Sequence, residues 1–369
     1  MGSAPVLSIC ISTYNAAHLL RVTLGALLPQ VASLGDLVEV LVVDDVSTDD
    51  TQAVVEAATA LGPVRHVRNE KNLGSSPNLV NGPVNHARGE FVWCWNQHCL
   101  LYPGALARVV EALQKQSHLD VFYANFRCAA YPADWPEQAE GGYQGPFRYL
   151  GHQILEDRKI DCWHELLEPL AGMGTQSYAH IVKRHVWTTF WAHRTLGFSY
   201  QDAISTYPHT YMLAHTVLHQ PSCYLGQPVI TIYNGAQSWG DLASRSRVWM
   251  WGWADLIQLY RKLGLTNSKV LEAEQFGSSE IAQLILAALQ QGNAAVLRML
   301  PRFLWLHGKR LDVVSSTWRA LLDSRCCGFA RGIVGFQLWW KRTTQYLFYQ
   351  CRPARWIRAH SCSGGTERV

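Results

Sequence analysis

The sequence lacks the features of an exported protein, of a membrane-spanning protein and of a protein with a structural metal site. Its start, MGSAPVLSIC, has no basic region followed by an apolar stretch, so we expect no secretory signal. No run of about 18 uncharged apolar residues occurs, so no spanning helix is expected. The ten cysteines include no CxxC pair, which argues against a structural zinc site. We expect reduced, buried thiols in a cytoplasmic protein.

Charged residues are also scarce. They make up 16% of the chain, below the roughly 25% of an average globular protein. With 48% hydrophobic residues among 369, the chain can bury a large core, which excludes a disordered regulator or a collagen-like fibre. The charge that is present is uneven, because residues 301–369 hold twelve Lys or Arg against three Asp or Glu.

Apolar runs typical of strands alternate with helical patterns over the first third of the chain. We predict strands over 6–12, 38–43, 64–68, 91–95 and 121–125, and helices over 17–28, 51–61 and 105–115. This alternation predicts a parallel sheet covered on both faces, with a ligand site at the carboxyl ends of the strands. The pattern is irregular from about 127 to 240 and helical from 242 onward.

Two polar clusters stand where the first two strands end. Thr13-Tyr14-Asn15 follows the first strand, and Asp44-Asp45 ends the second. A carboxylate at a strand end has a fixed direction and can accept hydrogen bonds from a nucleobase or from ribose hydroxyls. The alternative is that these acids cap the next helix, a role that Ser47 or Asp49 could also take.

Four segments of the first third, in register, resemble family 2 glycosyltransferases of the GT-A fold. They are LSICISTYN, EVLVVDDVSTDDT, NEKNLGSSPNLVNGPVNHARGEFVW and LLYPGAL. The later segment FSYQDAISTYPHTYMLAH resembles the acceptor half of O-antigen-type transferases, including abequosyltransferase-like members.

The resemblance implies an α/β fold, Rossmann-like, with a mostly parallel central sheet flanked by helices and a helical C-terminal extension. The expected divisions are a GT-A domain over 1–240, with a nucleotide-binding half (1–125) and an acceptor half (126–240), then a basic helical region (241–360) and a disordered tail (361–369).

The resemblance also implies which residues hold the nucleoside diphosphate of the donor. They are Ser12, Tyr14, Asn15, Asp44, Asp45, Asn72, Gly74, Asn78, Asn96, Gln97 and His98. Gly74 would let the backbone approach the ligand closely. Tyr14 could instead simply pack, and Asn72 could form an Asx turn.

The sequence departs from the family where a metal is usually held. An Asp-x-Asp or Asp-Asp element that binds Mg²⁺ or Mn²⁺ is replaced by Asn96-Gln97-His98. Three readings stay open. His98 could ligate a weakly bound divalent cation. A protonated His98, together with Lys or Arg from elsewhere, could instead replace the cation's charge. In the third, catalysis is lost and the fold survives as a binding module. We favour transfer without a metal, since hard cations prefer oxygen ligands.

Inverting transfer also requires a base for the acceptor hydroxyl. Asp202, in Tyr200-Gln201-Asp202, occupies the position where the family often has an acidic pair before a helix, and His209 is the reserve candidate. An N-cap for the following helix is the alternative role of Asp202.

Residues 296–358 interleave Arg and Lys with Trp, Phe and Leu. This composition suits the headgroup region of a membrane, and the alternative is a helical extension with solvated arginines. No helix-turn-helix or RNA-binding motif accompanies it, so no nucleic-acid partner is expected.

The sequence therefore predicts an inverting hexosyl- or deoxyhexosyltransferase (EC 2.4 type) of surface polysaccharide synthesis. Its donor would be a nucleotide-sugar and its acceptor a glycan linked to a lipid. The reaction would take place at the inner face of a membrane. The alternative is a catalytically silent module that binds nucleotide or a partner enzyme.

Overall fold

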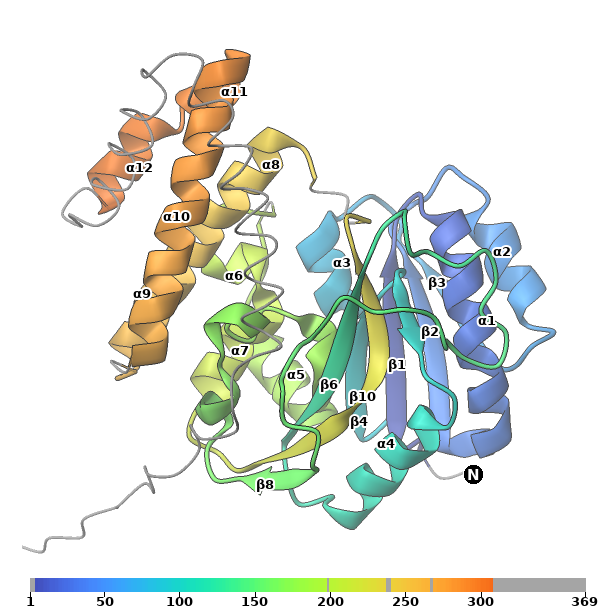
Figure 1. The fold of residues 1–369 in the computed structure, drawn as a ribbon. Coiled ribbons are helices and arrows are strands. Elements are labelled where there is room, and N and C mark those ends of the chain that lie inside the picture. The colour runs from blue at the N-terminus through green and yellow to red at the C-terminus, as the bar shows by residue number, and fades with distance from the viewer. Residues whose placement is uncertain (1–3, 198, 237–239, 266–267, 308–369) are drawn as a thin grey trace, which may run out of the picture.

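A ten-stranded sheet organises the protein in the order β3-β2-β1-β4-β9-β6-β10-β5, with β7 added on β6 and β8 on β10 (Figure 1). The computed structural model describes residues 4–197, 199–236, 240–265 and 268–307. The predicted disordered tail, and residues 308–358 of the predicted membrane-contacting region, lie outside the described residues. The strands are β1 (Leu7–Thr13), β2 (Val38–Asp44), β3 (Arg65–Arg68), β4 (Phe91–Asn96), β5 (Cys99–Leu101), β6 (Val121–Ala130), β7 (Tyr149–Leu150), β8 (Arg158–Ile160), β9 (His180–Lys183) and β10 (Ser222–Asn234).

Helices cover the sheet and build a further layer at the C-terminal side. They are α1 (Ala17–Leu34), α2 (Thr51–Ala58), α3 (Ser75–Asn81), α4 (Ala105–Lys115), α5 (Arg184–Trp191), α6 (Ala203–Thr206), α7 (Pro208–Thr216), α8 (Leu242–Arg247), α9 (Ala254–Lys262), α10 (Ser268–Gln291), α11 (Ala294–Leu297) and α12 (Leu300–His307). Two π-helices, η2 (Gly82–His86) and η6 (Val248–Trp253), extend α3 and join α8 to α9. Short 3-10 turns lie at η1 (Gly35–Leu37), η3 (Trp163–Leu166), η4 (Pro169–Ala171) and η5 (Ser177–Ala179).

The first part of the sheet is parallel, as the alternating pattern predicts. β1 lies between β2 and β4, with Leu7 opposite both Val38 and Phe91, and β2 also pairs with β3 in parallel. All but one residue of β1 and of β2 are buried. Strands covered on both faces read as continuous apolar runs, which is why sequence patterning finds them.

In the second part of the sheet, the sequence pattern indicated only β6, through the predicted strand 121–125. β10 is thirteen residues long and pairs with β6 in parallel, with a register shift between Leu225 and Ile230. β9 runs antiparallel between β4 and β6, and β5 runs antiparallel to β10. The interpretation of 127–240 as irregular is therefore wrong for β9 and β10. The predicted α/β class is confirmed, and the sheet is mixed because these strands are added to the parallel part.

Helix α4 illustrates why local patterning succeeds where one face is buried. Its predicted span is the observed one, and its buried residues follow helical spacing: Ala105, Leu106, Val109, Val110 and Leu113. α1 packs against α2 and α4, while α3, η2 and α5 lie together, with α3 and η2 against β1 and β2. The strand ends therefore emerge between two helical layers.

Among the described residues, one helix, Ala17–Leu37, is long and apolar enough to cross a membrane. It is 61% buried within the fold, which is typical of a core helix. The six described cysteines are also buried, and burial raises the pKa of the Cys99 and Cys128 thiols to about 12. They agree with the prediction of buried thiols.

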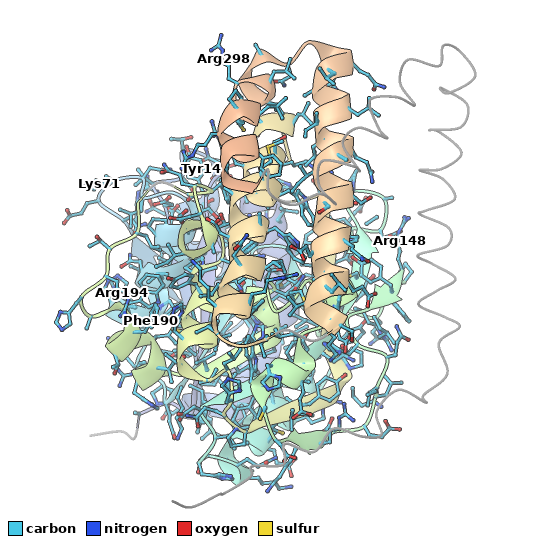
Figure 2. All side chains as sticks on the ribbon, turned by 90° about the vertical axis from the view of Figure 1, so that its left-hand side faces the viewer. Tyr14, Lys71, Arg148, Phe190, Arg194 and Arg298 are labelled. Atoms are coloured by element: carbon cyan, nitrogen blue, oxygen red, sulfur yellow. The ribbon has the colours of Figure 1, made fainter. Side chains whose placement is uncertain are left out.

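The C-terminal helices share the main core with the sheet. Trp253, Leu256 and Tyr260 are buried in the same apolar cluster as β1, and the Tyr260 hydroxyl donates to the Met173 carbonyl at 2.8 Å. Figure 2, turned to face the left-hand side of Figure 1, shows these helices in front of the sheet. The division at residue 240 stays a prediction.

Candidate functional site

The carboxyl ends of β1, β2 and β4 bring the predicted nucleotide residues to one edge of the sheet. Thr13 lies opposite Asp44, and Ser12 lies opposite Asn96 on the other side. Residues widely separated in sequence are thus neighbours in space because the three strands are parallel and in register. The site edge is where an open α/β sheet normally binds its ligand.

Asp44 is fully buried, and both carboxylate oxygens have partners. Oδ2 pairs with Arg68 Nη1 at 2.6 Å and lies 3.5 Å from His66 Nε2. Oδ1 accepts from the Ser47 backbone N–H at 2.8 Å. Arg68 also donates to the Ser47 carbonyl at 2.9 Å. Through these contacts Asp44 and Arg68 hold the backbone of Ser47, and so fix the turn after β2.

Asp45 holds the following loop rather than a helix cap. Its Oδ1 accepts from Asn69 Nδ2 at 2.8 Å and from the Leu73 N–H at 2.7 Å. Its Oδ2 accepts from the Gly74 N–H at 2.8 Å. At the start of α2 the N-cap residue is Asp50, whose side chain makes no capping hydrogen bond. The Asp49 side chain accepts there from the Thr51 backbone N–H and hydroxyl. Asp45 therefore shapes the segment predicted to run past the nucleotide.

Asn72, Gly74 and Asn78 lie in that segment, as predicted. Asn72 Oδ1 accepts from the Gly74 N–H, which is the Asx turn of the alternative interpretation, and Asn72 Nδ2 donates to the Asp45 carbonyl. Gly74 has φ +87°, a conformation that favours glycine. Asn78 is buried and donates to the Val43 carbonyl at 3.0 Å. The exposed Asn72 and the half-buried Gly74 are the parts of this segment that are open to a ligand.

Left-handed backbone concentrates around this edge. Asn15 and Val46 have φ of 49° and 66°, and Tyr200 has 68°. Such conformations are costly for non-glycine residues, above all for β-branched ones, and they are enriched at functional sites. Asn15 is held by Ser47 Oγ, which accepts from its N–H, and by Thr48, whose N–H donates to Asn15 Oδ1. Tyr14 next to it is 47% exposed, so it does not pack in the core.

The turn Asn96-Gln97-His98 offers no carboxylate. The Gln97 carbonyl accepts from the Thr23 hydroxyl at 2.7 Å, and His98 is buried with its Nδ1 lacking a partner among the described residues. Burial lowers the pKa of His98 to about 4, so its imidazole is neutral at pH 7. A neutral imidazole does not replace a cation's charge. The donor set also does not fit Mg²⁺ or Mn²⁺, which prefer oxygen ligands.

Asp202 caps helix α6. Its Oδ1 accepts from the Ser205 N–H at 2.9 Å and from the Ser205 hydroxyl at 2.6 Å. The Asp202 N–H donates in return to Ser205 Oγ at 3.1 Å, which completes a capping box. The side chain is half-buried. The role of Asp202 as N-cap is thus observed. A cap does not require a carboxylate, because Asn caps as well as Asp does. The carboxylate of Asp202 can therefore also have the predicted role as a base.

The fold brings the Asp202 loop onto the start of α3. The Ser76 hydroxyl donates to the Ser205 carbonyl at 2.6 Å, and the Ser76 N–H donates to Ser199 Oγ at 3.3 Å. The Tyr200 hydroxyl is also hydrogen-bonded to Ser75. These contacts place the acceptor-half loop beside the segment that Asp45 holds.

Asp255 of α9 is a neighbour of Asp202 that the sequence did not reveal. Burial and the nearby Asp202 charge raise the pKa of the Asp255 carboxyl, while the Ala203 backbone N–H donates to it. Its helix belongs to the C-terminal region, so no local motif linked it to the site. The arrangement joins that region to the α6 loop.

His209, the reserve base, lies in the core. It is buried, its Nε2 lies 3.0 Å from the Thr175 carbonyl, and burial lowers its pKa to about 3. Its ring is 6.3 Å from that of His180, which is also buried. These contacts favour a packing role for His209 over proton transfer with a solvent-borne hydroxyl.

Residues 8–167 match the model of Glycosyl transferase family 2. The matched segment is somewhat less than half of the chain and includes Asp44, Asp45, the 72–78 segment and the 96–98 turn. It supports a glycosyltransferase with a family 2 domain over these residues. No curated protein matches the chain.

Two solved structures illustrate the more distant likeness. TarS residues 1–349 from S. aureus in complex with UDP-GlcNAc is 14% identical, with a TM-score of 0.49 over 86% of this chain and 91% of that chain. The mannosyltransferase PcManGT from Pyrobaculum calidifontis, in complex with GDP-Man and Mn²⁺, is 17% identical, with a TM-score of 0.43 over 87% and 88%. Structures with so little similarity to this chain allow no inference about its substrate or cofactor.

Proposed function

We propose that this protein transfers a sugar from a nucleoside-diphosphate donor to a hydroxyl group, with inversion at the anomeric carbon. The observation that carries the proposal is the contact between the two halves of the site. The Asp202 loop rests on Ser76, directly after the segment that the Asp45 carboxylate holds. The family 2 match over residues 8–167 supports the donor half of this assignment.

The nucleoside would lie over the carboxyl ends of β1 and β2. Tyr14 is exposed there and offers a ring and a hydroxyl, while the loop offers the exposed Asn72 and the half-buried Gly74. The Asp45 carboxylate is buried beneath this loop, and three donors already fix the direction of its oxygens. A carboxylate has about four acceptor positions, so about one is left for a ligand. A pyrimidine base with an N–H donor suits such a carboxylate.

In the transfer step the acceptor oxygen attacks the anomeric carbon as the bond to the diphosphate breaks. The acceptor proton passes to Asp202, and the nucleoside diphosphate leaves with the bonding electrons. Ser205 holds one oxygen of Asp202 in the cap, which leaves the other oxygen to accept the proton. The Asp255 carboxyl lies beside it, and burial together with the Asp202 charge raises the pKa of Asp255.

We propose that the step proceeds without a divalent cation, since the 96–98 turn lacks oxygen ligands of charge −1. A glycan acceptor, linked to lipid, and a peripheral cytoplasmic location remain predictions that rest on sequence resemblance and on the basic composition of 296–358. The O-antigen type of acceptor and the hexosyl or deoxyhexosyl donor are predictions of the same kind.

Two variants separate the base from the helix cap. Asp202→Asn keeps an N-cap and removes the carboxylate, so we expect turnover to fall by about 100-fold or more with little change in Tm. Ser205→Ala weakens the cap and keeps the carboxylate, so we expect a loss of about 1 kcal/mol of stability with most turnover retained. Turnover is followed as nucleoside diphosphate released from UDP-, CDP- and dTDP-sugars. Full activity of Asp202→Asn would show that the base lies elsewhere.

The same assay tests the cofactor and the rival function. Release that is unchanged in EDTA supports transfer without a metal, and release that requires added Mn²⁺ contradicts it. If calorimetry detects nucleotide binding but no donor and acceptor pair is turned over, the catalytically silent module is the better account. Asp45→Ala is the matched variant for binding and should weaken nucleotide affinity in either case.

A further inference from the structure

Three side chains of metal-binding types meet away from the proposed transfer site. Cys162, His164 and His219 place their Sγ and ring nitrogen atoms within 4.8 Å of one another. Cys162 is buried, His164 is half-buried and His219 is exposed. The group therefore runs from the core to the surface, where an ion can enter.

Backbone hydrogen bonds hold the two contributing segments together. The Trp163 N–H donates to the Gln220 carbonyl at 2.8 Å, and the His164 N–H donates to the Leu218 carbonyl at 3.1 Å. These bonds flank His219, so the segment after β8 and the turn after α7 are fixed side by side. The two imidazole rings stand 5.2 Å apart at 77°.

Residues next to the ligands strengthen this fixation. The Trp163 side chain is fully buried, which anchors the short turn η3 in the core. The Glu165 carboxylate accepts from the Cys162 N–H at 3.1 Å. Lys269, a cation close enough to act on the pKa of His164, donates to the Glu165 carbonyl and pairs with Glu168 at 2.7 Å, so its charge has a carboxylate partner.

We propose that Cys162, His164 and His219 form a binding site for a divalent transition metal, with zinc as the ion that suits them best. One thiolate and two imidazoles are ligands that zinc prefers and that Mg²⁺ and Ca²⁺ do not. His219 is exposed, so water completes the fourth position. The site lies in the acceptor half and is independent of the 96–98 turn.

Metal binding requires only small movements of the three side chains and the release of one proton. Tetrahedral zinc places neighbouring ligand atoms about 3.5 Å apart, so the three side chains must close slightly, and the exposed His219 can do this by rotating. The Cys162 thiol gives its proton to solvent as the Sγ–metal bond forms. The ion would then cross-link the segment after β8 to the turn after α7.

Cobalt provides a direct test on the full-length, untagged chain stripped of metal with a chelator. Titration with Co²⁺ should give one ion per chain, with a thiolate-to-cobalt charge-transfer band and the visible bands of tetrahedral cobalt. Zn²⁺ should abolish these bands by competition. Cys162→Ser should lose the charge-transfer band, and His219→Ala should weaken binding by at least about tenfold.

His193→Ala is the matched control, because His193 is also exposed but lies outside the group. It should bind cobalt like the parent chain. Zn²⁺ should raise Tm in the parent and in this control, and not in His219→Ala. The surface position of His219 keeps that variant folded, which circular dichroism verifies.

The proposal is overturned if the parent chain gives no cobalt bands, or if the bands survive unchanged in both Cys162→Ser and His219→Ala. Equal loss in His193→Ala would also overturn it, since binding would then be non-specific. None of these readouts uses glycosyl transfer, so they do not depend on the proposed function.

Discussion

At the scale of single residues, Asp45 links the strand end to a loop that begins more than twenty residues later. Its carboxylate accepts from the Leu73 and Gly74 N–H groups and from Asn69 Nδ2. Hydrogen bonds to a charged acceptor are worth more than neutral ones. The same residue thus has a structural role and a proposed binding role, which substitutions must separate.

Asp45→Asn should destabilise the protein even without a ligand. The amide presents one N–H₂ group where the carboxylate accepts. Either the Leu73 N–H then loses its acceptor, or the Gly74 N–H keeps Asn72 Oδ1 alone and faces the N–H₂ group. We expect a loss of about 2–3 kcal/mol in the free energy of unfolding, measured by urea denaturation. Glu70→Gln, an exposed carboxylate in the same loop, should change it by less than about 0.5 kcal/mol. Equal effects of the two would contradict this account of Asp45.

At the scale of elements, the π-helix η6 lies against the short helix that Asp202 caps. A Cβ on Gly252 would lie 2.5 Å from both Oγ1 and Cγ2 of Thr206. Thr206 is in α6 and donates its hydroxyl to the Asp202 carbonyl at 2.6 Å. Glycine at this position therefore sets how closely η6 approaches the candidate base.

Gly252→Ala should displace α6 and disturb the Asp202 loop. We expect a loss of about 1–3 kcal/mol from overpacking, together with slower transfer at unchanged donor affinity. Gly25→Ala in α1 is the control, because a Cβ there meets nothing within 4 Å. It should stabilise the protein by about 0.5–1 kcal/mol through helix propensity. Thermal unfolding and initial rates measure both, and an unperturbed Gly252→Ala protein would refute the coupling.

At the scale of the whole molecule, buried histidines make stability depend on pH. Burial lowers the pKa of His98 and His180 to about 4 and that of His209 to about 3, against roughly 6.5 in an unfolded chain. The unfolded chain therefore binds protons that the folded protein does not. The contribution to stability is complete above pH 6.5 and is lost as the pH falls toward the folded pKa values.

Unfolding at a series of pH values tests this dependence. Between about pH 5.5 and 4.5 these three groups should contribute roughly 4 kcal/mol per pH unit to the fall in the free energy of unfolding. His152, whose pKa burial lowers to about 3, adds to this fall. His209→Gln retains an N–H that can donate to Thr175 and removes one titrating group. Its slope should be smaller by about 1.4 kcal/mol per pH unit. A slope unaffected by the substitution would rule out His209 as a contributor.

The C-terminal helices should also be needed for folding, because their residues share the main core. A chain ending at residue 240 loses Trp253, Leu256 and Tyr260, all of which are buried. The buried Met173 carbonyl loses the Tyr260 hydroxyl that donates to it. We expect this shortened chain to bind a hydrophobic dye and to lack a cooperative thermal transition. A cooperative transition near the full-length Tm would show instead that 1–240 folds on its own.

The sequence by itself determined the elements whose pattern is local. Strands β1, β2 and β4 and helix α4 follow from apolar runs and helical spacing, and Asp44-Asp45 at a strand end indicated the site edge. These features depend on neighbours within one element, and a linear pattern records them directly. The limits of the predicted spans, such as Ala17–Leu34 in place of 17–28, reflect packing that extends beyond the local pattern.

Only the tertiary structure decided what meets at each site. The insertion of β9 between β4 and β6, the contact of Ser76 with the Asp202 loop, and the neutral state of His98 all arise from long-range packing. The meeting of Cys162 and His164 with His219 has the same origin. Such contacts are fixed by the pairing and burial of distant segments, and no spacing along the chain encodes them.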